Sequence, residues 1–218
     1  MNIIIMGIQG SGKGTQSKLL AEKYDLKHIS TGDVLRKHIA DKTPFGVKYQ
    51  QEYDKGNLAP DGVLFEIVKY ETDNIDGKKG WILDGFPRTR YQCSWALTHL
   101  QIDKLIVLLV GDTDVVYRRL IQRGRSDDTN SAITSRIEKY YSDTAPCISD
   151  IWGTLASRDV ITVDATEEIN DVFNNIEIAL RSDFRTELDH WISSDDFLAE
   201  MALVEPFIMF LVFLFWLN

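Results

Sequence analysis

Short runs of apolar residues alternate along this chain with longer stretches in which apolar residues recur at helical spacing. The apolar runs predict strands at residues 2–6, 28–29, 81–83, 105–110 and 160–163. The stretches between them predict helices at residues 13–24, 31–41, 61–72, 90–100, 113–122, 133–156 and 167–180. Because strands that alternate with helices of this length form βαβ units, the pattern predicts an α/β fold, with a parallel sheet flanked by helices on both faces. Ligands of such sheets bind at the carboxyl ends of the strands.

The stretch after the first predicted strand, residues 6–15, reads M-G-I-Q-G-S-G-K-G-T. Its glycines suit neither a strand nor a helix interior, but they let the backbone fold closely around a polyphosphate and point N–H groups at it. Lys13 supplies a mobile cation, and Thr15 supplies a hydroxyl that can reach Mg²⁺. A generic glycine-rich turn is the alternative. The spacing, the lysine and the strand–loop–helix setting favour a phosphate-binding P-loop.

Two later strand ends carry polar residues that suit phosphate chemistry. Residues 28–36 read H-I-S-T-G-D-V-L-R, which places Arg36 about one turn into a predicted helix, within reach of an anion at the helix start. Helix capping is the alternative interpretation of this motif. Residues 81–92 read W-I-L-D-G-F-P-R-T-R-Y-Q, so Asp84 ends an apolar strand where P-loop enzymes hold Mg²⁺ through water. The chain then turns and presents Arg88; a plain strand–turn–helix with a surface arginine is the alternative here.

Five arginines gather between residues 118 and 136, in a region that is otherwise nearly neutral. Arg119 and Arg123 lie four residues apart and therefore share one helical face, and Arg125 follows after a single glycine. The neighbouring Asp127 and Asp128 can hold these guanidiniums in fixed orientations when no ligand is bound. A solvated helix face is the common reason for such a cluster. We favour phosphate binding.

The composition is that of an ordinary globular protein. The 218 residues, 44% of them hydrophobic and 26% charged, suffice for one domain with a sizeable core. The net charge of −9 argues against a general nucleic-acid-binding surface. Cys93 and Cys147 are isolated in the sequence, which excludes a four-cysteine zinc site and predicts reduced thiols. The chain starts on a core strand without a signal-peptide pattern, so we expect a cytoplasmic protein.

The composition changes near residue 181, which predicts a domain of residues 1–181 and an extension of residues 182–218. The extension holds seven acidic residues and one basic residue, and so carries −6 of the total charge of −9. It contains eleven consecutive apolar residues at 207–217, fewer than the roughly 17–20 that a membrane helix needs. Three alternatives stay open: a marginal membrane association through residues 201–217, packing against the core or a second copy, and a non-native end from an altered reading frame.

Together these motifs resemble those of the adenylate kinases, members of the nucleoside monophosphate kinase family. The loop is similar to their G-x-P-G-x-G-K-G-T, residues 28–36 to the helix of their monophosphate lobe, and residues 83–92 to their L-D-G-F-P-R-T-x-x-Q. The resemblance covers residues 1–181. It implies a P-loop three-layer fold with a small monophosphate-binding lobe at about residues 30–59 and a very short lid at about residues 119–136.

The resemblance also implies a reaction and a set of site residues. The reaction is reversible transfer of the terminal phosphoryl group of MgATP to AMP, giving two ADP, without zinc. The residues that match the ATP site are Gly10, Ser11, Gly12, Lys13, Gly14, Thr15, Arg119 and Arg123. Those that match the AMP site are Thr31, Arg36, Asn57, Leu58, Ala59, Gly85, Phe86, Pro87, Arg88, Gln92, Arg125 and Arg136. The implied catalytic residues are Lys13, Arg88, Arg123, Arg125 and Arg136, and the implied metal residues, largely through water, are Thr15, Asp33 and Asp84.

Two positions decide the expected acceptor. Family members that prefer UMP or CMP typically carry alanine where Thr31 stands and asparagine where Gln92 stands, so we expect AMP; a UMP/CMP kinase is the alternative. A buried amide such as Gln92 can pair with the edge of adenine, and the wrong base would leave polar groups unpaired. A nucleotide-binding module without turnover is a further alternative, but it would be expected to have lost some of the lid arginines. We expect a monomer that binds ATP and AMP and no nucleic acid.

Three features depart from the family pattern. Gln9 replaces the loop proline, and Ala59 stands in the acceptor-base pocket where valine is usual. The lid is reduced to a stub, because one glycine alone separates Arg123 from Arg125 and no long β-rich insertion or zinc cysteines are present. A stub lid predicts that bound ATP is less well enclosed, so more ATP hydrolysis or faster product release is expected.

Overall fold

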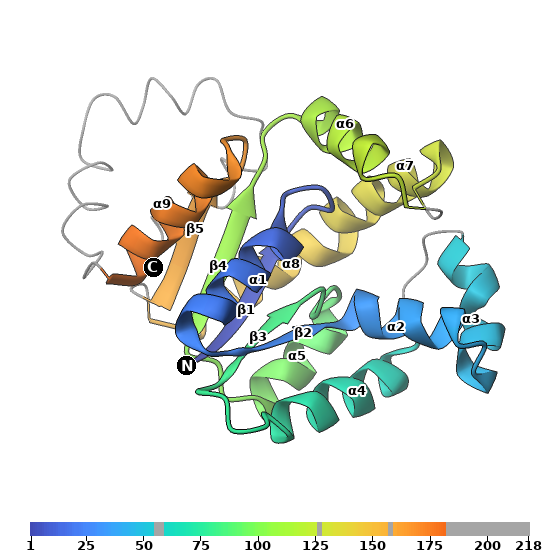
Figure 1. Cartoon of the computed structure of the whole chain (residues 1–218), viewed down its shortest axis with the longest axis horizontal. Helices are drawn as coiled ribbons and strands as arrows, with labels where there is room; N and C mark the ends of the chain where they lie inside the picture. The colour runs from blue at the N-terminus through green and yellow to red at the C-terminus, as the bar shows by residue number, and fades with distance from the viewer. Residues whose placement is uncertain (55–58, 126–127, 157–158, 182–218) are drawn as a thin grey trace.

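The computed structural model describes residues 1–54, 59–125, 128–156 and 159–181 (Figure 1). Its strands are β1 (Asn2–Gly7), β2 (Lys27–Ser30), β3 (Trp81–Asp84), β4 (Lys104–Leu109) and β5 (Val160–Asp164). Its helices are α1 (Lys13–Tyr24), α2 (Thr31–Ala40), α3 (Pro44–Asp54), α4 (Asp61–Asp73), α5 (Arg90–His99), α6 (Thr113–Arg123), α7 (Asn130–Lys139), α8 (Ala145–Trp152) and α9 (Ile169–Arg181). A π-helical turn, η1 (Tyr140–Thr144), joins α7 to α8.

The strands form one five-stranded sheet in the order β2-β3-β1-β4-β5, and every neighbouring pair is parallel. The central strand β1 pairs with β3 through Ile4 and Leu83 and with β4 through Ile4 and Leu105. Because all strands run the same way, the loops that follow β1, β2 and β3 meet at one edge of the sheet (Figure 1). The predicted α/β fold with a parallel sheet is confirmed.

Helices cover both faces of the sheet, and β1 shows how the sequence produces the two cores. Side chains alternate along a strand, so Ile3 and Ile5 pack into one apolar cluster and Ile4 and Met6 into the other. The first cluster includes residues of α1, α6, α7 and α9, and the second includes residues of α4, α5 and α8. A strand buried on both faces therefore reads as a continuous apolar run, as residues 3–6 do.

The structure differs from the predicted elements at two places. The helix expected at 133–156 is divided into α7, η1 and α8, and Pro146 explains the division because it has no N–H to donate and its ring crowds the preceding turn. The helix α3 was not predicted. Its Gly46 lowers helix propensity, yet a Cβ there would lie 2.0 Å from the carbonyl oxygen of His38 at the end of α2. Helix α3 therefore packs closely against α2 at Gly46, a contact that the local sequence does not predict.

The remaining domain predictions are placed as follows. Helices α2 and α3 extend away from the sheet at the right of Figure 1, within the predicted lobe of residues 30–59. Residues 124–129 are all that separates α6 from α7, so the lid region is short. The extension 182–218 lies outside the described residues, and the alternatives for it stay predictions. Within the described ranges, no helix combines the length and apolar character needed to cross a membrane.

Candidate active site

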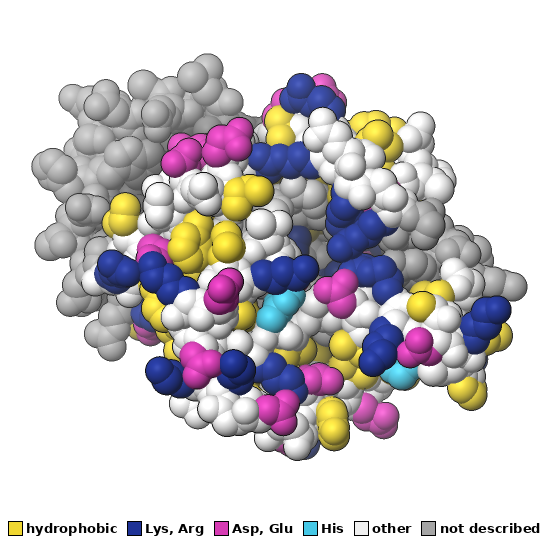
Figure 2. Space-filling view, in the orientation of Figure 1, with side chains coloured by type: hydrophobic (Ala, Val, Ile, Leu, Met, Phe, Trp, Pro, Cys, Tyr) yellow, Lys and Arg dark blue, Asp and Glu magenta, His cyan; other side chains and the backbone are white. Residues whose placement is uncertain are grey.

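An open cavity of about 870 Å³ lies at the carboxyl ends of β1, β2 and β3. Its walls come from the loop after β1, the starts of α1 and α2, the turn after β3, and the end of α6. Figure 2 shows Lys and Arg side chains gathered along this hollow. The cavity is therefore at the edge of the sheet where the sequence predicts ligand binding.

The loop after β1 is held in a conformation that its glycines make accessible. Gly10 has φ 87° and Gly12 has φ 91°, values that residues with a Cβ rarely adopt. A Cβ on Gly7 would lie 2.6 Å from the carbonyl oxygen of Leu108, so β1 and β4 approach closely at this point. Residues 10–15 all line the cavity and lead into α1. Because the first N–H groups of a helix have no partner within it, this end of α1 can bind a phosphate.

Lys13 is folded back onto the loop. Its Nζ donates to the carbonyl oxygens of Gly7 at 2.7 Å and Ile8 at 2.8 Å. Burial lowers the pKa of Lys13 from 10.5 to about 8, although the Asp84 carboxylate opposes this shift and Arg88 adds to it. Lys13 can therefore exchange two carbonyl partners for a phosphate, whose negative charge would favour the protonated amine.

The three predicted metal residues all line the cavity but differ in their surroundings. Asp84 ends β3 against the first turn of α1, since a Cβ on Gly14 would lie 3.4 Å from its Oδ2. Thr15 stands at the start of α1. The Asp33 carboxylate instead forms an ion pair with Arg36 on the same helix. Among the described residues no three His, Cys, Asp or Glu side chains cluster to hold a metal. A Mg²⁺ here would accordingly take most of its ligands from phosphates and water.

The arginines of α6 and α7 are held by carbonyl and carboxylate oxygens. Arg119 donates from Nη1 to Ala165 O at 2.6 Å and from Nη2 to Thr166 O at 3.0 Å. Asp128, whose side chain is only 2% exposed, accepts two bonds from Arg123 at 2.7 and 2.9 Å and one from Arg136 at 3.0 Å. This confirms the orienting role predicted for Asp128; Asp127 lies outside the described residues.

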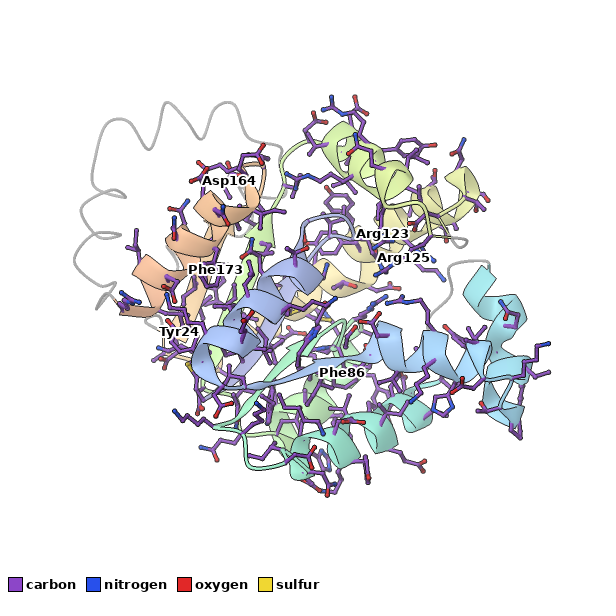
Figure 3. All side chains as sticks on the ribbon, in the orientation of Figure 1. Tyr24, Phe86, Arg123, Arg125, Asp164 and Phe173 are labelled. Carbon is purple, nitrogen blue, oxygen red and sulfur yellow. The ribbon has the colours of Figure 1, made fainter. Side chains whose placement is uncertain are left out.

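Arg125, in the connection between α6 and α7, lines the same side of the cavity as the arginines of these two helices. In Figure 3, Arg123 and Arg125 lie next to one another between the end of α6 and the start of α2. Both line the cavity, and the charge of Arg125 acts on Asp33 of α2. The short connection between α6 and α7 therefore still brings its arginines over the site.

The turn after β3 forms the opposite wall. Arg88 is half-buried and donates from Nε to Gly85 O at 2.7 Å. Burial lowers its pKa, while Asp84 opposes the shift and Arg136 and Arg36 add to it. A Cβ on Gly85 would lie 2.9 Å from both Arg88 Nη2 and Thr31 Oγ1, so glycine is required between these two predicted site residues.

Several predicted AMP-site residues are not brought to the cavity. Gln92 is fully buried; its Oε1 accepts from Arg88 N at 2.7 Å, and its Nε2 donates to Asp61 Oδ1 at 2.7 Å. Phe86 and Pro87 line a second cavity of about 30 Å³ instead. Asn57 and Leu58 lie outside the described residues. Ala59 and Thr31 do line the main cavity, as do Arg36 and Gly85.

Several residues that line the cavity were not assigned to the site by the sequence analysis, and Tyr49 and Gln16 are two buried examples. Tyr49 is 5% exposed and comes from α3, the helix that was not predicted, so the sequence carried no signal for it. Gln16 follows the loop directly and is 2% exposed; its Nε2 donates to Ile169 O at 2.9 Å. A buried amide one turn into α1 is a signal that could have been found from its position after the loop.

Comparison with known proteins identifies relatives of this chain. The adenylate kinase family profile matches residues 5–153. "Adenylate kinase 1" of Nostoc sp. is 39% identical over 184 residues, covering 83% of this chain and 98% of that protein. "Adenylate kinase" of Bifidobacterium longum is 40% identical over 185 residues, covering 81% and 97%. "Adenylate kinase" of Clostridium tetani is 36% identical over 218 aligned residues, again covering 83% of this chain and 98% of that protein, so that protein carries residues that this chain lacks.

Proposed function

The chain belongs to the adenylate kinase family, and on this basis we propose that it reversibly transfers the terminal phosphoryl group of MgATP to AMP, giving two ADP. The observation that carries the proposal is the convergence of cationic side chains on one cavity, which besides Lys18 include Lys13, Arg36, Arg88, Arg119, Arg123, Arg125 and Arg136. Phosphoryl transfer leaves little covalent work for a protein, and positioning with charge stabilisation dominates. A cavity that receives two polyanions in line needs such a set.

In this proposal the two nucleotides bind from opposite sides. The loop of residues 10–15 and the arginines Arg119 and Arg123 hold the ATP phosphates. The acceptor site consists of Thr31, Arg36, Ala59, Gly85 and Arg88, while Arg125 and Arg136 reach between the nucleotides. Gln92 is fully buried and bonded to Arg88 N and Asp61 Oδ1, so it contacts the base only when these bonds are exchanged.

No general base is assigned. The phosphate of AMP is already an anionic nucleophile, so the protein needs only to bring it in line with the γ-phosphate and to stabilise the charge that develops during transfer. When MgATP is bound, Thr15 and Asp84 would hold Mg²⁺ largely through water, and the ion would supply further charge neutralisation. We also propose that the protein needs no zinc and is a cytoplasmic monomer; size-exclusion chromatography with light scattering tests the oligomeric state.

The deciding experiment offers AMP, UMP and CMP separately with MgATP and measures ADP formation. The proposal expects turnover with AMP that exceeds turnover with either pyrimidine nucleotide. Preference for UMP or CMP would instead identify the alternative, a UMP/CMP kinase. Nucleotide binding without turnover of any acceptor would identify a non-catalytic binding module.

A further inference from the structure

The segment that carries Arg88 is held by three hydrogen bonds. The backbone N–H of Arg88 donates to Gln92 Oε1 at 2.7 Å, and its side-chain Nε donates to Gly85 O at 2.7 Å. The backbone carbonyl oxygen of Arg88 accepts a hydrogen bond from Thr144 Oγ1 at 3.0 Å. The first two partners lie within four residues of Arg88 along the chain, whereas Thr144 lies 56 residues away. The third bond therefore ties the local turn to a different part of the molecule.

The π-helical turn η1 explains why this hydroxyl is directed to Arg88. Three other helix threonines, Thr72, Thr98 and Thr134, donate to the carbonyl oxygen four residues back in their own helix. For Thr144 that carbonyl belongs to Tyr140, which in the π turn accepts the N–H of Ala145, five residues along, so the backbone around Thr144 is wider than around the other three threonines. The hydroxyl of Thr144 donates to Arg88 O instead.

The following proline accounts for the wide turn itself. Pro146 cannot donate an N–H to the carbonyl four residues before it, and its ring crowds that carbonyl, so a regular α-helix is unfavourable at this point. A π turn spreads the backbone and is frequent at functional sites. The Thr-Ala-Pro sequence at residues 144–146 thus produces the contact with Arg88.

Thr144 also lies where the catalytic groups meet. It lines the small cavity of about 30 Å³ together with Lys13, Gly85 and Arg88. The turn continues directly from α7, which carries Arg136, and the charge of Arg136 acts on Arg88. The hydroxyl of Thr144 therefore connects the element that carries Arg136 to the backbone that carries Arg88.

We propose that Thr144 is a positioning residue for phosphoryl transfer, whose hydroxyl holds Arg88 in place relative to α7 and Arg136. The inference rests on the role proposed above for Arg88 at the acceptor phosphate. A hydrogen bond to the carbonyl of Arg88 restrains the backbone from which its guanidinium extends. Small misplacements of a charge-stabilising group are costly in rate, so the bond acts on turnover although Thr144 touches no reacting atom.

The test removes the hydroxyl and keeps the side-chain volume. Thr144→Val is expected to lower kcat roughly tenfold while KM for ATP stays within about twofold, because the ATP loop is unchanged. Thr144→Ser, which keeps the donor, is expected to retain most of the activity. Thr98→Val is the matched control: its hydroxyl bonds within its own helix and is exposed, so wild-type kinetics are expected. Thermal unfolding of each variant shows whether the fold is retained.

A double variant separates this inference from the role of Arg88. In an Arg88→Ala background, Thr144→Val is expected to cause no further loss, because the positioned group is gone. A further loss as large as the one that Thr144→Val causes in the wild-type background would overturn the inference. Wild-type kcat in Thr144→Val would also overturn it, and so would equal losses of kcat in Thr144→Ser and Thr144→Val. Wild-type activity of Arg88→Ala alone would instead contradict the proposed function of Arg88. Should Thr144→Val not fold, the pair Thr144→Ser and Thr144→Ala, which differ only in the hydroxyl, gives the same comparison.

Discussion

At the scale of single residues, the cationic side chains of the cavity are held by protein oxygens. Lys13 donates to two loop carbonyls, and Arg88 donates to Gly85 O. Arg123 and Arg136 share the carboxylate of Asp128. Such bonds fix the cations near the positions where phosphates are needed, and little reorganisation is then required on binding.

Loss of one such cation should reduce turnover strongly. Arg88→Ala is expected to fold normally and to lose about a hundredfold to a thousandfold in kcat, since one positioned donor contributes about 3–4 kcal/mol in the transition state. A coupled assay of ADP formation measures the loss. Near wild-type rates would contradict the placement of Arg88 at the transferred phosphoryl group.

The lowered pKa of Lys13 predicts a pH dependence of ATP use. With a pKa of about 8, Lys13 in the free enzyme loses its charge as the pH rises through that value. Since kcat/KM reports the free enzyme, kcat/KM for ATP is expected to fall above about pH 8. Arginine stays charged throughout this range, so a Lys13→Arg variant, whatever its absolute rate, is expected to lack the fall. A flat wild-type profile from neutral to alkaline pH would refute this assignment.

At the scale of elements, one carboxylate joins the first helix to the last. Glu177 of α9 is 7% exposed; it forms an ion pair with Lys23, accepts from the Tyr24 hydroxyl at 2.8 Å, and bonds Arg181 at 3.2 Å. Figure 3 shows Tyr24 and Phe173 on the facing sides of α1 and α9. Because α1 begins at the phosphate loop, this contact anchors the far end of the helix that carries Lys13.

Removing the charge of Glu177 should destabilise the protein in a pH-dependent way. The hydrogen bond from Lys23 lowers the pKa of Glu177 below its usual 4.5, and Tyr24 adds to the shift. This stabilisation is therefore present above pH 4.5 and is lost as the pH falls further towards the folded-state pKa. Glu177→Gln is expected to cost about 1–3 kcal/mol at pH 7, and less in acid. Urea unfolding measures this loss of unfolding free energy, and Glu66→Gln, at an exposed position, is the control. Equal losses of unfolding free energy at pH 7 and pH 4 would exclude a stabilisation that depends on the charge of Glu177.

At the scale of the whole molecule, the two lobes that border the cavity differ in size. Helices α2 and α3 form an extended projection on the acceptor side (Figure 1), whereas residues 124–129 are all that connects α6 and α7 on the donor side. Closure of such lobes excludes water, which competes with AMP as an acceptor. The donor side therefore has little chain with which to cover ATP.

The short lid predicts background hydrolysis of ATP. With AMP omitted, ADP formation is expected to be faster than in an adenylate kinase with a long lid, because water reaches the γ-phosphate more readily. Parallel assays of the two enzymes at equal concentration measure the difference. A background as low as that of the long-lid enzyme, with unchanged product release, would rule out poorer enclosure.

The C-terminal extension is expected to be dispensable for catalysis. Every residue proposed for the site lies between residues 10 and 136, and α9 ends at Arg181. A chain of residues 1–181 should therefore keep kcat and both KM values within about twofold. Comparing activity, solubility and partition into lipid vesicles before and after truncation tests this boundary together with the membrane alternative. Loss of activity would place part of the functional domain beyond residue 181.

The sequence by itself determined the features that depend on short stretches of chain. The apolar runs at 2–6 and 105–110 predict central strands because both faces of those strands are buried. The loop of residues 10–15 and the turn at 84–88 were predicted because glycine spacing and cation type carry phosphate chemistry locally. Such signals do not depend on knowledge of the fold, and they identified two of the stretches that line the cavity.

Only the tertiary structure decided which distant groups meet. The bond between Thr144 and Arg88 depends on how η1 packs against the turn that follows β3. Burial of Gln92 against Asp61 likewise depends on the contact of α4 with α5. These pairings join residues far apart in the chain, and local periodicity carries no information about them. The phosphate loop could therefore be predicted from the sequence, whereas the positioning of Arg88 opposite it could not.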